Sequence, residues 1–491
     1  MDRTATAPRL PAGALRLSTG IAAAAWALAA AALAGGAGLL AAANPRLAFT
    51  ICICGAAALA VRFAPFAVLL VLLVFVAHPS PLADMLLFAT VVGGGPVIVW
   101  RLIRTPGKVF LVPLALFLLL ALNGLQWTDN DPLLERPKGL VLPVLHFHYV
   151  TLQTLELQDW LRLAAVLVVG LLATASVRSV QRLRLVAAAV VVGAVFPFVD
   201  AARQIVSGDL VTRNGSFGAV RGSFGFPNEL AVYLVVILVV AIVAAFVVRR
   251  PGLKVALLGV IGLGVFLLLH TYTRSAWIAF SIALMLIAVL RYRWLLVVAA
   301  LTLVVAVAGF PSAVHSVQQR FGDLTAQNQA NASNSLTWRR GQWSAMAHFG
   351  SDAPLTGQGF GSYRRLSVQQ FGLEGRTYGT VGDAQGNGQV EIGFTAHNDF
   401  VKAYVENGVP GLVLWVAVLV GLAIAQVRLL RIPSLAPWGV AMLAALVGIV
   451  IMSASDNVQA YSVPIFYVVA ITAALAALAR REPVTAPAAA P

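Results

Sequence analysis

Long apolar runs alternate with short polar connections along almost the whole chain. A helix needs about 20 apolar residues, with a range of roughly 17–25, to cross the hydrocarbon core of a bilayer. Several runs are shorter than this, and the first five are the hardest to delimit, so we predict an all-α polytopic integral membrane protein with about 12–14 transmembrane helices. The runs cover residues 18–43, 46–61, 64–77, 83–100, 109–123, 160–177, 183–202, 228–248, 253–270, 275–290, 294–310, 411–427, 437–453 and 461–479.

Lysine and arginine gather in alternate connections, and membrane proteins carry such positive charge on the cytoplasmic side. The opposite short connections hold little of it, apart from Arg46 and Arg274. Both termini are therefore expected in the cytoplasm. The basic connections contain Arg3, Arg9, Arg16, Arg62, Arg101, Arg104, Lys108, Arg178, Arg182, Arg184, Arg249, Arg250, Lys254, Arg291, Arg293, Arg428, Arg431, Arg480 and Arg481.

The composition agrees with a membrane protein, because 60% of the 491 residues are apolar and 11% are charged, against about 25% charged residues in soluble domains. The net charge of +15 follows the orientation pattern, which argues against a nucleic-acid partner. Few ionisable residues interrupt the apolar runs, which argues against a proton-coupled transporter. Cys52 and Cys54 share one apolar run and are expected to be small core residues.

The pattern divides the chain into five parts. A large outer loop stands out, because loops longer than about 12–15 residues are usually functional or disordered, and its tryptophans favour order over a merely solvated cap. The parts are a cytoplasmic N-terminus at 1–17, transmembrane helices at 18–310 with outer loops near 124–159 and 203–227, the large outer loop at 311–398, C-terminal transmembrane helices at 399–479 and a disordered cytoplasmic tail at 480–491.

The first candidate site is a glycine-rich loop between Arg213 and Glu229. Glycines let the backbone approach a ligand closely, and a helix opened by Pro227 or Asn228 has N-terminal amides that favour anions. Arg221 stands six residues before Pro227, where it can clamp a phosphate. An interfacial arginine that binds lipid headgroups explains the same residues.

The second candidate site is the turn at residues 270–277, where two apolar runs meet with almost no loop. Arg274 then lies at the outer membrane face, against the positive-inside tendency, and this indicates a local anion. The alternative is a snorkelling arginine with Trp277 as an interfacial anchor.

The third candidate site is the large outer loop, in which residues 338–348 predict an amphipathic helix and residues 352–361 a turn-rich segment. After the loop, a short helix is predicted from about Asn398 to Asn407, with Thr395 as its N-cap. Gly408 ends this helix and Pro410 opens the next membrane helix.

His397 stands where the large loop re-enters the membrane region. On the predicted helix Tyr404 shares its face, while Lys402 and Glu406 form an i,i+4 pair. Glu406 is nine residues from His397, nearly on the opposite side of the helix, and is not expected to orient the imidazole. An ordinary polar residue at a helix start is the alternative for His397.

Five motifs occur in the order seen in the O-antigen ligase and polymerase superfamily of bacterial envelope glycan enzymes, and the chain resembles that superfamily over about residues 213–427. Each motif alone is weak, whereas the ordered set is specific. The motifs are Arg221 before Pro227-Asn228, Thr273-Arg274-Ser275, Arg339 with Trp343, Pro354 to Gly361, and His397-Asn398 to Gly411.

The resemblance implies transfer of a glycan from an undecaprenyl-diphosphate donor to an acceptor hydroxyl, on lipid A core or a similar glycolipid, at the periplasmic face of the bacterial inner membrane. This chemistry requires charge stabilisation at the diphosphate and a base for the hydroxyl, for which arginines and a histidine are suited. The implied catalytic residues are His397, Arg221 and Arg274, and the implied substrate-binding residues are Arg339, Asn228, Tyr404 and Asn398.

No cofactor and no metal are expected, because no His, Asp or Cys cluster has metal-ligand spacing and the family is regarded as metal-independent. The expected partners are the lipid-linked glycan donor, the acceptor and membrane lipids. A polysaccharide polymerase that uses the same donor is the first alternative, and the large single loop with its complete His-Asn motif favours a ligase. A lipid-linked glycan transporter or flippase is the second alternative, although polar helix linings are lacking.

Overall fold

The structure is a computed structural model that describes residues 45–481 with gaps at 79–80, 101, 103–106, 123–151, 214–216, 298–299, 301–335, 372–375, 382–387 and 394. The predicted N-terminus at 1–17, the apolar run at 18–43 and most of the tail therefore lie outside the described residues. So do most of the outer loop at 124–159 and of the run at 294–310.

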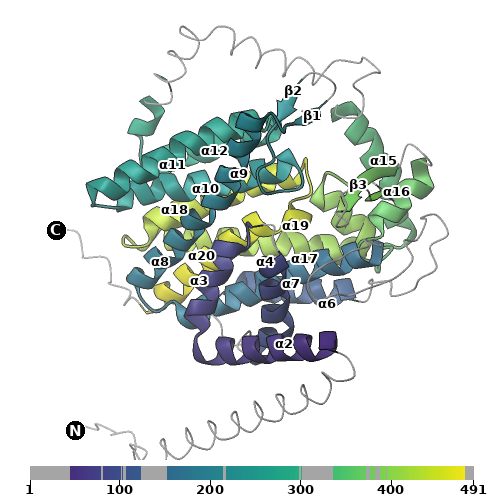
Figure 1. Ribbon diagram of the computed structural model, residues 1–491, viewed down its shortest axis with the longest axis horizontal. Coiled ribbons are helices and arrows are strands. Elements are labelled where there is room, and N and C mark those ends of the chain that lie inside the picture. Colours follow the sequence, from purple (N-terminus) through teal and green to yellow (C-terminus); the bar gives the residue numbers. More distant parts are fainter. Residues whose placement is uncertain are drawn as a thin grey trace, which may run out of the picture.

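Apolar helices form the membrane region, and Figure 1 shows them packed in a bundle with the large loop at one end. The described helices before the large loop are α2 (Pro45–Phe63), α3 (Pro65–Phe75), α4 (Pro81–Ala89), the π-helix η1 (Thr90–Gly94), α5 (Gly95–Val99), α6 (Lys108–Leu122), α7 (Leu152–Ser176), α8 (Val180–Gly193), α9 (Val195–Ser207), α10 (Pro227–Val247), α11 (Pro251–His270) and α12 (Arg274–Leu290). Those within and after it are α15 (Leu336–Asp352), α16 (Tyr363–Phe371), α17 (Asp399–Leu429), α18 (Ala436–Ser453), α19 (Val458–Tyr461) and α20 (Val463–Ala479).

The helices confirm the all-α, multi-pass membrane class. In the described part of the chain, 6 helices are long and apolar enough to cross a membrane, or up to 7 if the bent pair of α2 and α3 is one span. The predicted 12–14 helices refer to the whole chain, and the run at 18–43 and most of the run at 294–310 lie outside the described residues. One reason why not every described run counts as a span is that Pro65 bends α2 and α3 apart by 119°, since proline cannot continue a helix. A second reason is that several apolar runs form shorter helices of 10–17 residues, namely Met85–Val99, Lys108–Leu122, Arg274–Leu290 and Val463–Ala479.

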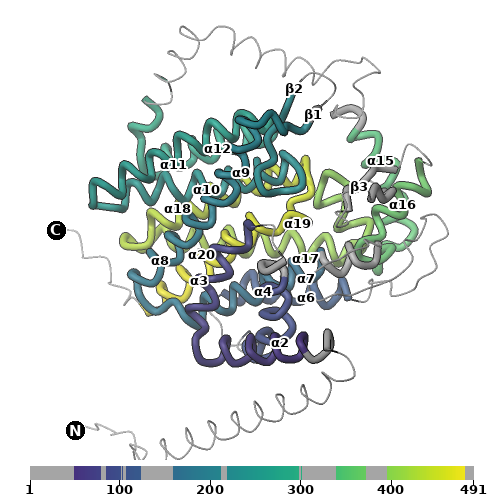
Figure 2. Tube along the Cα trace, viewed as in Figure 1, coloured from purple at the N-terminus to yellow at the C-terminus, as the bar shows by residue number. Residues whose placement is uncertain are grey.

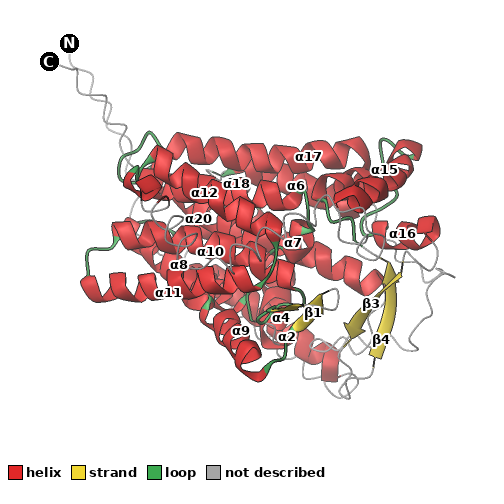
Figure 3. Ribbon diagram, turned by 90° about the horizontal axis from the view of Figure 1, so that it is seen from above, coloured by secondary structure: helices red, strands yellow, loops and turns green. Residues whose placement is uncertain are grey.

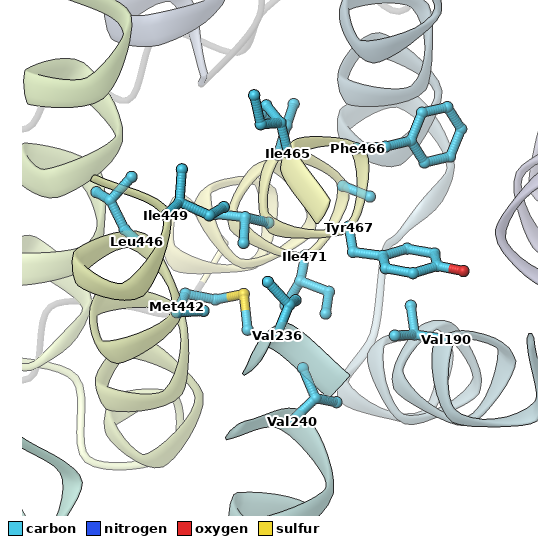
Figure 4. Close-up of a cluster of buried hydrophobic side chains, with 14 of the residues drawn as sticks. Val190, Val236, Val240, Met442, Leu446, Ile449, Ile465, Phe466, Tyr467 and Ile471 are labelled. Atoms are coloured by element: carbon cyan, nitrogen blue, oxygen red, sulfur yellow. The ribbon is translucent and has the colours of Figure 1, made fainter. Parts of the chain in front are cut away.

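The centre of the bundle is formed by α10 and α20, in which nearly every side chain is buried. Both helices are apolar all round, as expected of core or membrane-spanning helices, and α10 contacts α11, α18 and α20 while α20 also contacts α7. Helices far apart in the sequence, such as α12 and α18, lie side by side (Figure 2). Figure 4 shows the buried cluster of α8, α10, α18 and α20, with Val190, Val236, Val240, Met442, Leu446, Ile449, Ile465, Phe466, Tyr467 and Ile471 labelled.

One end of the bundle, here called the site end, gathers the starts of α10, α12 and α17 and the ends of α9, α11 and α18. The backbone N–H of Val220 donates to the carbonyl of His270 (3.1 Å), and the Asn398 amide donates to the carbonyl of Ala454 (3.2 Å). These bonds join segments that are separated by about fifty residues in each case. The sequence places the candidate motifs at helix ends, and the packing brings those ends together.

The described part of the large loop is partly helical, as predicted, with α15, α16 and an antiparallel hairpin of β3 (Arg376–Val381) and β4 (Gly388–Gly393). Figure 3 shows the hairpin beside α16 at one end of the bundle. A second short hairpin, β1 (Val211–Arg213) with β2 (Phe217–Ala219), lies at the start of the glycine-rich loop. The two hairpins are small additions to a helical protein.

The turn-rich segment after α15 packs against the kink in α17. Gly408 interrupts that helix with a φ of 65°, and the N–H of Val409 donates to the carbonyl of Pro354 (2.8 Å). Gly357 has a φ of +67°, and a Cβ there would lie 2.4 Å from the carbonyl oxygen of Glu406. Both glycines are needed because the two backbones touch, so two of the motifs found in the sequence form one packing contact.

Candidate functional site

His397 stands just before α17 in a left-handed conformation with a φ of 47°. Its N–H donates to Asn457 Oδ1 (2.8 Å). Asn398, not Thr395 as predicted, is the N-cap, because its Oδ1 accepts from the N–H groups of Phe400 (3.0 Å) and Val401 (3.1 Å). Asn398 has an extended backbone that suits a cap.

The Thr395 hydroxyl has a different role, because its Oγ1 accepts from Asn457 Nδ2 (2.6 Å). Asn457 is thus bonded both to the backbone of His397 and to Thr395. The loop end at 395–398 is fixed against the connection between α18 and α20.

The imidazole of His397 faces a buried carboxylate, with Nδ1 3.3 Å from Asp456 Oδ1. Asn457 Nδ2 lies 3.2 Å from the same nitrogen, but an amide Nδ2 only donates and a carboxylate only accepts. Because Asn457 Nδ2 has Thr395 Oγ1 as its acceptor, a proton on Nδ1 can be donated to Asp456, and in that tautomer Nε2 is the basic nitrogen. The side chain of His397 is 29% exposed, whereas that of Asp456 is 1% exposed.

Asp456 is held as a carboxylate by its neighbours. Burial raises its pKa, but the hydrogen bond and charge of His397 and the charge of Arg339 outweigh burial and lower the pKa below the usual value. The Tyr461 hydroxyl (2.7 Å) and the N–H of Asn457 (2.9 Å) also donate to Oδ1. Sequence reasoning missed Asp456, and the available signal was an Asp-Asn pair between two apolar runs.

Arg339 reaches this centre from α15. Its Nη1 donates to the carbonyl of Ser455, next to Asp456, and its Nε is buried without a hydrogen-bond partner among the described residues. Trp343 Nε1, one turn further along α15, donates to the carbonyl of Ala396 (2.7 Å), next to His397. The Trp-Arg-x-x-x-Trp helix is therefore fastened to both sides of the His397–Asp456 pair.

The Arg221 loop is fixed by a residue that the sequence did not single out. The buried Gln204 amide accepts at Oε1 from the N–H groups of Arg221 and Gly222 (3.0 Å each), and its Nε2 donates to the carbonyl of Gly222 (2.8 Å). Gly222 has a φ of +56°, and a Cβ there would lie 2.8 Å from the carbonyl oxygen of Pro197. The backbone under Arg221 is therefore rigid, while its side chain is only half-buried.

Arg274 is the first residue of α12, and its neighbour Thr273 joins it to the first candidate site. The Thr273 hydroxyl donates to Asn228 Oδ1 (3.1 Å), and both side chains are buried. With the bond between Val220 and His270, this brings the Arg221 and Arg274 segments side by side. Asn228, predicted to bind substrate, braces the two segments.

Glu229 lies within electrostatic range of both Arg162 and Asp456. Its Oε2 accepts from the N–H of Gly225 (2.9 Å) in the glycine-rich loop, and its carboxylate is attracted by Arg162 on α7 and repelled by Asp456. Helix α7 also contacts α19. Neither Glu229 nor Arg162 was a predicted site residue, since neither stands out from its own surroundings in the sequence.

A separate polar cluster fastens the large loop to the bundle. Asp159 Oδ2 lies 3.8 Å from both Lys402 Nζ and Arg364 Nη2, so Lys402 has its ion pair with Asp159 and acts on Glu406 only at longer range. Glu406 Oε1 accepts from the N–H of Tyr363 (3.4 Å). Glu406 therefore anchors the loop and does not orient His397, as expected.

Tyr404, also predicted to bind substrate, has its contacts on α15. Its hydroxyl lies 3.2 Å from the Ser351 hydroxyl, and a Cβ on Gly350 would lie 2.5 Å from its ring. Tyr404 thus packs α15 against α17, and the structure does not bring it to the His397–Asp456 pair.

Backbone strain is concentrated at the site end. The described residues other than glycine with a positive φ are Tyr272 (50°), His397 (47°) and Ser462 (46°). They adjoin, respectively, the Arg274 turn, the loop end and Tyr461. Such conformations cost roughly 1–3 kcal/mol each and gather at functional sites. All three lie at the site end, next to segments that carry candidate site residues.

Among the described residues, no group of three or more His, Cys, Asp or Glu side chains is placed to hold a metal ion. A family model described as O-antigen ligase matches residues 258–416. The match includes Arg274, Arg339 and His397, whereas Arg221 and Asp456 lie outside it. No curated protein sequence matches the chain.

Proposed function

We propose that the protein transfers a glycan from an undecaprenyl-diphosphate donor to an acceptor hydroxyl at the periplasmic face of the bacterial inner membrane. The match of residues 258–416 to a family model described as O-antigen ligase supports this proposal. The observation that carries this proposal is the His397–Asp456 pair, with Nδ1 3.3 Å from Oδ1, next to the Arg339 helix. Glu229, at the end of the glycine-rich loop, is close enough to Asp456 for their charges to repel. A base and several cations then occupy one membrane-proximal site.

The proposed reaction is a single displacement at the anomeric carbon. The acceptor hydroxyl oxygen forms a bond to that carbon as the bond from the carbon to the donor diphosphate breaks. Nε2 of His397 takes the hydroxyl proton, and Asp456 stabilises the imidazolium that forms, as a buried carboxylate does beside a histidine base. Undecaprenyl diphosphate leaves, and the proton passes to solvent.

Arginine side chains are proposed to bind the diphosphate. Arg221 and Arg274 stand on adjoining turns, and Arg339 lies beside Asp456. Guanidinium groups bind phosphate oxygens in a bidentate manner, and cations that are fixed before the reaction stabilise the charge that develops on the leaving group. Lipid headgroups have the same phosphate chemistry, so snorkelling arginines are the competing explanation.

Ligase and polymerase activity use the same donor and differ in the acceptor. We favour a ligase, with lipid A core or a similar glycolipid as acceptor. Deletion of the gene separates the two activities. Loss of a ligase should leave long glycan chains on undecaprenyl diphosphate, whereas loss of a polymerase should leave single repeats on the final acceptor. A flippase would instead leave the lipid-linked glycan on the cytoplasmic side.

The proposal is tested with His397→Ala. Loss of a general base typically lowers the rate by about 10²–10⁴-fold, so glycan transfer should nearly disappear while donor binding is retained. The measurement is undecaprenyl diphosphate release by purified protein, with lipid-linked glycan from the deletion strain as donor and lipid A core, or the same lipid-linked glycan, as acceptor. His348→Ala is the matched control, because His348 is exposed on α15.

The pH profile of the same assay tests the role of the imidazole. A base must be unprotonated, so the rate should fall as the pH is lowered. A rate that rises toward acid pH would instead show that protonated His397 works as a donor to the diphosphate. Full activity of His397→Ala at normal protein levels would contradict both roles.

A further inference from the structure

Resting on the proposed function, we propose that Tyr461 is a positioning residue that fixes Asp456 and, through it, the orientation and basicity of His397. Tyr461 ends α19, and its hydroxyl donates to Asp456 Oδ1 at 2.7 Å. The same oxygen faces His397 Nδ1. Tyr461 therefore bonds to the carboxylate oxygen that the imidazole uses.

The local backbone is built to hold this hydroxyl in place. The N–H of Gln459, in the middle of α19, donates to both carboxylate oxygens of the buried Asp399, at 3.2 and 3.1 Å. Ser462 directly after Tyr461 has a φ of 46°, which is costly for a residue other than glycine. A four-residue helix that is tied to α17 and followed by a strained residue is a stiff support for one side chain.

Asp456 has several charged neighbours besides the imidazole. Arg339 from α15 attracts its negative charge, whereas Glu229 from α10 and Asp399 from α17 repel it when they are ionised. Tyr461 interacts with both Asp456 and Glu229. Its hydroxyl is thus the neutral donor between two acidic groups, and it directs Asp456 Oδ1 toward His397.

Removal of the Tyr461 hydroxyl should change the pH dependence of the rate, which loss of packing alone would not do. Without the donor, Asp456 becomes a stronger acceptor for the imidazolium, so protonated His397 is favoured and the acid side of the pH–rate profile moves to higher pH. Asp456→Asn removes the negative charge, so the acid side of the pH–rate profile should move to lower pH. A general loss of structure would lower the rate equally at every pH.

The experiment compares Tyr461→Phe with wild type in the undecaprenyl diphosphate release assay across a pH series. Loss of a hydrogen bond to a charged group typically changes a rate about tenfold. We therefore expect kcat to fall about tenfold while the donor KM is unchanged. The acid side of the pH–rate profile should move to higher pH. Tyr467→Phe is the matched control, since its hydroxyl donates to the carbonyl of Leu73 (3.0 Å) in the bundle core.

A double-variant cycle shows whether Tyr461 acts through Asp456. Once Asp456→Asn is present, Tyr461→Phe should have no further effect on the position of the acid side. An unshifted acid side in the single variant, or additive effects in the double variant, would overturn the inference. If His397→Ala kept its activity, the proposed function would fail instead, so the two failures are distinguishable.

Discussion

At the residue scale, the backbone turns next to Arg221 and Arg274 are each held by a buried polar side chain. Gln204 fixes the turn that carries Arg221, and the Thr273–Asn228 hydrogen bond fixes the turn before Arg274. A cation on a rigid turn loses little freedom when it binds an anion, so these residues are suited to a diphosphate.

Arg274→Ala is expected to lower the transfer rate by about 10²–10³-fold, because a preorganised group that stabilises developing charge is lost. Arg274→Lys should restore little activity, since an ammonium group cannot replace a bidentate guanidinium. The measurement is kcat and donor KM in the release assay. Arg291→Ala, at the opposite end of α12, should be near wild type, and normal transfer by Arg274→Ala would remove it from the site.

At the element scale, the contact between the turn after α15 and the kink in α17 determines where α15 lies. α15 carries Arg339 toward Asp456, and the turn that follows it is bonded to α17 through Gln358, Gly359 and Val409. Gly357 and Gly408 therefore affect the site indirectly, because their contact fixes the position of α15, which carries Arg339.

Gly357→Ala should lower both thermal stability and activity, because the new Cβ would lie 2.4 Å from backbone atoms of α17 and a positive φ strains any other residue. Gly341→Ala is the control, since no atom lies within 4 Å of a Cβ there and alanine favours a helix by roughly 0.5–1 kcal/mol. Thermal unfolding in detergent measures the difference. Equal stability of the two variants would show that the contact is unimportant.

At the scale of the whole molecule, the bundle places the starts of three helices and the connection between α18 and α20 at one end. The charges in the connections predict that this end faces the periplasm, and the proposed function requires it. The proposed function therefore depends on the orientation of the protein in the membrane.

Cysteine labelling tests the orientation in a variant in which Cys52 and Cys54 are replaced by alanine. In cells with a permeabilised outer membrane, Ser216→Cys and Ala330→Cys should react with a membrane-impermeant thiol reagent, whereas Gly252→Cys should not. Gly252 is exposed near the start of α11, so a lack of reaction there would not be due to burial in the bundle. The reverse pattern would place the site in the cytoplasm.

The sequence by itself determined the membrane class, the helix ends near Pro227, Arg274 and Gly408, and the partly helical loop. These features depend on local composition, since apolar length, proline and glycine act within a few residues. The number of spans follows less directly from the sequence, because several apolar runs are interrupted by proline or form helices shorter than 18 residues.

Only the tertiary structure decided which polar groups meet. Asp456 lies 59 residues after His397, and no spacing on one helix or strand relates them; they face each other because α17 and α18 pack together. Glu406, Tyr404 and Asn228 each form a hydrogen bond with a segment that is distant in the sequence, and in this way they hold elements of the fold together. A sequence motif identifies residues that matter, but their separate roles arise from contacts between elements distant in the chain.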